Sequence, residues 1–158
     1  MLLLAAILTF APPPAEIPRL EQEILALTNM ERARRGLHEL AGDEALHLAA
    51  RAHSGDMLRR NYFDHRNPEG ERATDRVARH DREHRRFAEI AENIWMGSGY
   101  PPERIERIAR EIIAGWMNSH GHRENILRPE VQLIGVGVVV SGGSIYATQV
   151  FAEPPRRR

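Results

Sequence analysis

The sequence contains no cysteine and no lysine, so all 22 basic residues are arginine, and 22 acidic residues balance them. The absence of cysteine excludes disulfides, thiolate nucleophiles, lipidated thiols and cysteine-based zinc sites. The absence of net charge removes the overall field that favours nucleic acid or anionic membranes. Aromatic residues, at 6%, are also few. We therefore expect no nucleic-acid partner.

A long hydrophobic run is missing as well. Residues 1–11 carry no charge and are dominated by Leu, Ile and Ala, but as a helix they would span only about half of a roughly 30 Å hydrocarbon core. We interpret residues 1–15 as a signal peptide and expect an exported protein, extracellular or periplasmic, with no stable membrane span. A mis-assigned start or an uncleaved apolar tail is the alternative. Residues 16–153 then form one domain, followed by a polar tail at 154–158.

Hydrophobic periodicity predicts three long helices. The chain between and after them contains turn residues and short extended segments. The three helical stretches are residues 16–35, with Ile17, Leu20, Ile24, Leu27 and Met30 on one face; residues from the N-cap Asp43 to Met57; and residues from Pro101-Pro102 to Trp116, a helix that must end by Gly121.

Residue type predicts the strands. Residues 131–140 and 145–151 are rich in strand-forming side chains on either side of a Gly-Gly turn, which predicts a β-hairpin. Residues 87–95 are a further extended segment, in which Glu92 shares a face with apolar neighbours. A carboxylate in such a setting needs a cation or several donors, so Glu92 is either paired structurally or functional. Residues 71–86 are densely charged and predict a short solvated helix plus loop.

Polar side chains gather in two places. His65 follows Asp64 in the loop 61–72, where Tyr62 and Phe63 are expected to hold the loop by packing; the alternative for His65 is a surface histidine. The second place is the junction after the third long helix, which contains Ser119, His120, His122, Arg123 and Asn125. Two histidines and a carboxylate from separate elements, with Glu92 as the carboxylate, are the ligand set of a zinc site with open positions.

His53 lies on an apolar helix face and is expected to be a core or cleft-edge histidine.

Several motifs in order make the chain resemble the bacterial branch of the CAP superfamily, also called SCP domains. The resemblance covers nearly everything from Ile17 to Glu153. The motifs are Asn29-x-x-Arg32 with Gly36-Leu37; Ala49 to Met57; Tyr62-Phe63-x-His65; Arg76; Glu92-Asn93-Ile94; Trp116-x-x-Ser119-x-Gly121-His122-Arg123-x-Asn125-Ile126-Leu127-x-Pro129; Ile134-Gly135-Val136-Gly137; and Gln149-x-Phe151.

The resemblance implies an α+β fold, a three-layer α-β-α sandwich with a small, mainly antiparallel sheet, and it implies secretion. It also implies a cleft with two histidines and two glutamates that binds zinc in some members. His65, Glu92 and His122 match three of these positions. The fourth, three residues after the helix tryptophan, is Ser119, and a serine does not replace a carboxylate as a strong base or anionic ligand. The cofactor expected is therefore Zn²⁺ or another divalent cation, held at most weakly.

Three functional hypotheses follow. The first is a binding or interaction module for a cell-envelope, lipid or protein ligand, with a metal on His65 and His122. The second is a zinc-dependent peptidase or esterase, in which His65 and His122 hold zinc and Glu92 is the general base. His120 is either an added ligand or a solvent-exposed histidine, and we favour the solvent-exposed alternative. A metal-independent Ser119, His122 and Glu92 triad is a variant of this hypothesis. The third is a structural domain in which these residues form a buried hydrogen-bond network.

Overall fold

The computed structural model describes residues 16–99 and 104–154. The predicted signal peptide, the Pro101-Pro102 helix start and residues 155–158 of the polar tail lie outside the described residues. In the described part, five helices surround four strands. In chain order these are α1 (Glu16–Ala33), β1 (Ala41–Gly42), α2 (Glu44–Arg60), α3 (Ala73–His80), β2 (Glu89–Ser98), α4 (Ile105–Asn118), α5 (His120–Leu127), β3 (Leu133–Ser141) and β4 (Ser144–Glu153).

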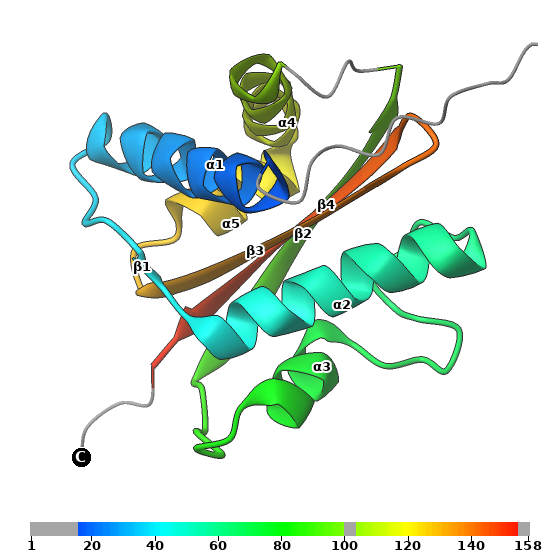
Figure 1. Cartoon of the computed structure of the whole chain (residues 1–158). Helices are drawn as coiled ribbons and strands as arrows, with labels where there is room; N and C mark the ends of the chain where they lie inside the picture. The colour runs from blue at the N-terminus through cyan, green and yellow to red at the C-terminus, as the bar shows by residue number, and fades with distance from the viewer. Residues whose placement is uncertain (1–15, 100–103, 155–158) are drawn as a thin grey trace, which may run out of the picture.

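The sheet has the order β1-β3-β4-β2 and is mixed. Strands β3 and β4 form the predicted antiparallel hairpin, β2 pairs antiparallel with β4, and the two residues of β1 pair parallel with β3. Helices α1, α4 and α5 cover one face and α2 and α3 the other (Figure 1). The three-layer α-β-α sandwich predicted from the sequence is confirmed.

The sheet has a hydrophobic core on each face because successive strand residues point to opposite sides. On β4, Phe151 belongs to the core under α1, α4 and α5, and its neighbour Val150 to the core under α2 and α3. Trp116 of α4 is buried and donates its indole N–H to the carbonyl of Ile94 in β2 (3.0 Å). The layers are therefore joined by packing and by directional bonds.

Two glycines of β3 let α2 approach the sheet closely. A Cβ at Gly135 would lie 2.1 Å from the carbonyl carbon of Leu46, and one at Gly137 would lie 2.0 Å from the backbone nitrogen of Arg51. Since real side chains never come so close to backbone, these positions require glycine for helix packing. This contact accounts for the Ile134-Gly135-Val136-Gly137 motif.

Three predictions about local structure were incomplete or wrong. The helix that ends at Asn118 is followed at once by α5, which the sequence did not reveal and which contains Gly121 in its first turn. Met30 is 49% exposed instead of facing the core, and α1 buries Arg32 among other polar side chains. Of the two aromatic residues expected to hold the loop, Phe63 is 45% exposed, and Tyr62 donates its hydroxyl to Asp56 (2.8 Å).

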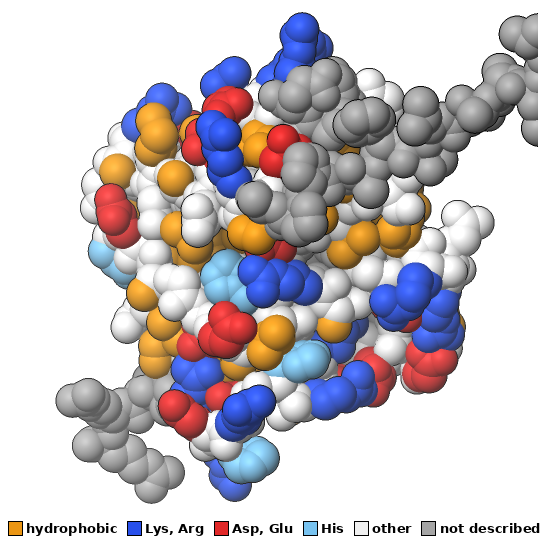
Figure 2. Space-filling model, viewed as in Figure 1, with side chains coloured by type: hydrophobic (Ala, Val, Ile, Leu, Met, Phe, Trp, Pro, Cys, Tyr) orange, Lys and Arg blue, Asp and Glu red, His pale blue; other side chains and the backbone are white. Residues whose placement is uncertain are grey.

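The visible surface carries blue and red side chains interleaved rather than in separate fields (Figure 2). This pattern agrees with the balanced composition. Across residues 16–99 and 104–154, no helix combines the length and apolar character that crossing a bilayer requires.

Candidate functional site

Glu92 lies in the centre of β2 and its side chain is only 5% exposed. Its Oε2 accepts a hydrogen bond from Arg76 Nη2 (2.6 Å), and its Oε1 accepts one from His65 Nδ1 (3.0 Å). The cation that the sequence required for Glu92 is therefore Arg76 of α3. This ion pair joins the sheet to α3 and to the loop that carries His65.

Arg76 also fixes that loop directly. Its Nη1 donates to the carbonyl of Glu71 (3.0 Å) and its Nη2 to the carbonyl of His65 (3.2 Å). The residue is buried, although the sequence around it predicts a solvated face. One arginine thus neutralises the carboxylate and holds the backbone next to it.

His65 and His122 face each other from two different elements. Their ring centroids lie 6.5 Å apart with an interplanar angle of 50°. The hydrogen bond to Glu92 raises the pKa of His65, whereas burial and, to a smaller extent, the charge of His65 lower the pKa of His122. On acidification, His65 therefore takes up a proton before His122 does.

An amide network positions α5, and with it His122, against β2. Asn93 Nδ2 donates to the carbonyl of His122 (3.1 Å). Asn125 Nδ2 donates to Asn93 Oδ1 (2.9 Å) and to the carbonyl of Glu92 (3.2 Å). The buried Arg32 of α1 donates to the carbonyl of Ile126 (2.8 Å) near the end of α5. The polar residues at the junction therefore set the position of the second histidine.

His53 of α2 is a third histidine beside Glu92. It is fully buried, its Nε2 lies 3.0 Å from the carbonyl of Asp64, and the same nitrogen lies 3.8 Å from Glu92 Oε1. Burial lowers the pKa of His53, so the contact with Glu92 joins a neutral ring to a carboxylate at neutral pH. The sequence predicts a core histidine here but did not reveal that it borders Glu92.

Ser119 and His120 stand apart from this network. His120 Nδ1 lies 3.5 Å from Glu124 Oε2, and its side chain is 77% exposed. Because α5 is helical, residues two apart such as His120 and His122 point in different directions. Ser119 joins α4 to α5 and makes no side-chain capping bond. The described residues show no hydrogen bond from Ser119 to His122 or Glu92, so the proposed triad and the added ligand stay predictions.

Sequence comparison matches the chain to a known protein family. The sequence model of the Cysteine-rich secretory protein family, CAP, matches residues 25–151. The chain belongs to the CAP family. Its match to the protein YkwD of Bacillus subtilis (strain 168) is 38% identical over 145 residues and covers 92% of this chain and 52% of YkwD.

Solved CAP structures agree with the fold. An extracellular SCP-domain protein of Bacillus anthracis superposes with a TM-score of 0.72 at 31% identity, covering 91% of this CAP domain chain and 45% of that chain. NaASP2, crystallised with Zn²⁺, gives 0.61 at 14% identity over 89% of this chain and 83% of that one, a likeness in fold alone. The chain thus spans about half the length of the first two bacterial relatives.

His65 and His122 of this CAP domain fit a metal site with free coordination positions better than one in which the protein fills all four. Both oxygens of Glu92 are turned to Arg76 and His65, the arrangement of a carboxylate that orients a ligating histidine. On Zn–N bonds of about 2.0–2.1 Å, two imidazoles on one tetrahedral zinc have ring centres roughly 5 Å apart. Within the described ranges no group of three or more His, Asp or Glu is arranged to hold a metal ion. A bound metal therefore requires the exposed His65 ring to move toward His122.

Asp64 and Glu89, the carboxylates next to His65 and three residues before Glu92 in the sequence, have partners of their own. Asp64 Oδ1 accepts from the backbone N–H of Arg66 (2.7 Å). Glu89 forms an ion pair with Arg128. The pKa of His65 is raised first by its hydrogen bond to Glu92 and to a smaller extent by the charge of Asp64. Among the described residues, neither Asp64 nor Glu89 makes a hydrogen bond or ion pair with His65 or His122.

Proposed function

We propose that this CAP domain is an exported binding module in which His65 and His122 hold a divalent metal ion, with zinc as the best-suited ion. The observation that carries the proposal is the His65–His122 pair, 6.5 Å between ring centroids, with one ring oriented by a buried carboxylate. The extracellular description of the Bacillus anthracis relative supports export. NaASP2, which was crystallised with Zn²⁺, shares this fold.

The chain's own residues provide two imidazole donors, of which His65 must lose its extra proton and move its ring toward His122 before both can ligate one metal ion. Glu92 accepts from His65 Nδ1, which leaves Nε2 of the same ring for a metal. His122 has its pKa lowered by burial and is therefore neutral at physiological pH. When bound, zinc supplies a Lewis-acidic attachment point for an anionic or carbonyl group of a ligand. The remaining coordination positions favour recognition of a cell-envelope, lipid or protein ligand.

Binding is favoured over hydrolysis because the site lacks an available base. A general base must reach the proton it abstracts, but both oxygens of Glu92 are already paired with Arg76 and His65. Ser119 replaces the carboxylate that the family pattern places there. The hydrolase hypothesis would need Glu92 to leave a buried ion pair.

Calorimetric titration of the metal-stripped chain with zinc tests the proposal. Two imidazoles supply about half the ligands of a structural zinc site, so we expect a Kd of roughly 1–100 μM. The double variant His65→Ala, His122→Ala is expected to lose this binding, and the matched variant His120→Ala to keep it. Affinity should fall as the pH decreases through the raised pKa of His65, because protons then compete with the metal.

Two results would contradict the proposal. Unchanged zinc affinity in the double variant would show that zinc binds outside this cleft. Hydrolysis of a peptide or ester by the zinc-loaded protein, lost in Glu92→Gln while the protein stays folded, would replace the binding module with a hydrolase.

A further inference from the structure

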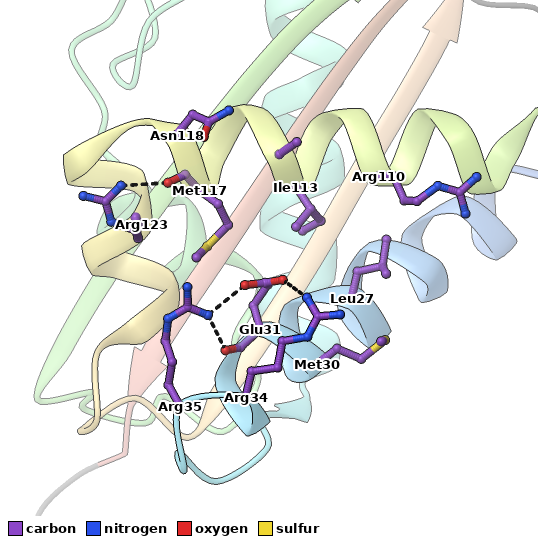
Figure 3. Close-up of a pocket in the computed structure, with 11 residues that line it drawn as sticks. Leu27, Met30, Glu31, Arg34, Arg35, Arg110, Ile113, Met117, Asn118 and Arg123 are labelled. Atoms are coloured by element: carbon purple, nitrogen blue, oxygen red, sulfur yellow. Dashed lines mark hydrogen bonds and ion pairs between the residues drawn. The ribbon is translucent and has the colours of Figure 1, made fainter.

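A second concave surface lies in the helical layer formed by α1, α4 and α5. Figure 3 shows it between the end of α1, the C-terminal half of α4 and the start of α5. Its volume is about 640 Å³, and Glu92, His65, His122 and Arg76 do not line it. We call it the α1–α4 groove. It is a site separate from the proposed metal cleft.

Apolar side chains form part of the groove. Leu27 and Met30 come from α1, and Ile113 and Met117 come from α4. Met30 is 49% exposed, although its spacing in the sequence continues the row of apolar residues along α1. Thioether side chains adapt to differently shaped apolar partners. The groove therefore offers a compliant apolar surface.

Arginines surround these apolar side chains. Four arginines and one glutamate line the groove, so its lining carries a formal net charge of +3. Arg34 and Arg35, just after α1, share Glu31, at 2.5 and 2.8 Å. Arg110 of α4 is exposed and has no hydrogen-bond or ion-pair partner among the described residues. The local charge contrasts with a chain whose formal net charge is zero. The fourth guanidinium, that of Arg123, donates to the carbonyl of Met117 (2.8 Å).

We infer that the α1–α4 groove binds a short acidic segment of a partner protein that presents an apolar side chain between its carboxylates. A purely polyanionic chain would leave the apolar surface unused, and a neutral lipid would leave the arginines unused. The guanidiniums come from three places, the end of α1, α4 and α5 (Figure 3). A single anionic head group meets one of these places, whereas a peptide with several carboxylates meets them together.

Fluorescence anisotropy of the full chain tests this inference. The probe is a short labelled peptide with glutamates on both sides of a central leucine. Binding is expected to weaken at least about tenfold in Arg110→Glu, because a partner carboxylate then meets a like charge. The matched control Arg59→Glu makes the same charge change on α2, across the sheet, at an arginine whose side chain is 68% exposed. That variant is expected to bind as the parent does.

The peptide itself supplies further controls. Replacing its leucine with serine, or its glutamates with lysines, should abolish measurable binding. The variant His65→Ala, His122→Ala should bind the parent peptide normally, so that failure of the metal proposal and failure of this one are distinguishable. Equal binding by Arg110→Glu and parent would overturn the inference. Binding of phosphatidylglycerol vesicles in preference to the peptide, lost in Arg110→Glu, would overturn it in favour of a membrane surface.

Discussion

Arg76 is the residue on which the arrangement around Glu92 most depends. Its guanidinium neutralises a carboxylate that is 5% exposed and also holds two loop carbonyls. Removing one member of a buried ion pair leaves the other charged and without compensation. The same residue positions the His65 backbone, so its effect extends to the proposed metal site.

We therefore expect Arg76→Met to lower the free energy of unfolding by about 3–5 kcal/mol, measured by urea denaturation. Arg79→Met is the matched control on the same helix: Arg79 is 58% exposed and pairs with Glu71, and its loss should cost at most about 1 kcal/mol. Equal effects of the two substitutions would show that the Glu92 pair contributes no more than a surface contact.

The same residues show what sequence reasoning can and cannot reach. The apolar neighbours of Glu92 predicted that it needs a partner, since burial of a lone carboxylate is costly. The identity of the partner was not predictable, because Arg76 stands in a charge-dense run and its burial results from how α3 docks. His53 was likewise predictable as a core residue, but not as a neighbour of Glu92, which is distant in sequence.

At the scale of elements, β3 is nearly an edge strand. Its partner β1 reaches only Leu133 and Ile134. Beyond them, side chains cover the backbone: Val136 donates its N–H to His47 Nδ1 (3.0 Å), and Val138 donates to Glu21 Oε1 (3.0 Å). Covering an edge in this way prevents pairing with another chain. The polar residues buried on α1 and α2 thus have a structural role.

The close approach of α2 to β3 gives a prediction at this scale. Gly137→Ala is expected to destabilise the fold by at least about 2 kcal/mol, because its Cβ would overlap the α2 backbone. Gly121→Ala is the control: its position in α5 has nothing within 4 Å of an added Cβ, and alanine favours a helix. Thermal denaturation of both variants checks this. A tolerated Gly137→Ala would mean that α2 can move away from the sheet without loss.

Helix α5 was not predictable from the sequence. It is eight residues long, only Ile126 of it is buried, and it contains Gly121. A short helix with one buried residue has no hydrophobic period to detect. By contrast, α4 buries Ile105, Ile108, Ile112 and Trp116 at helical spacing and was predicted within a few residues.

At the scale of the whole molecule, helix α5 contributes to two different surfaces, with His122 in one and Arg123 in the other. The His65–His122 pair lies on the loop before α3 and on α5, and the α1–α4 groove lies within the helical layer made by α1, α4 and α5. Hydrophobic periods predicted the long helices and residue type the hairpin, whereas the three-layer arrangement was implied by the resemblance to the CAP family. The groove was not predicted, because it gathers arginines from three elements that the sequence treats as ordinary solvated residues.

Nitrogen-resolved NMR during a zinc titration reports metal binding at each histidine ring separately. The ring signals of His65 and His122 are expected to change together as zinc is added near pH 7.5, while those of His47 and His120 stay in place. His47 Nδ1 accepts from the backbone N–H of Val136, and His120 lies beside Glu124. Unchanged His65 and His122 signals at saturating zinc, or changes centred on His120, would contradict a metal site on His65 and His122.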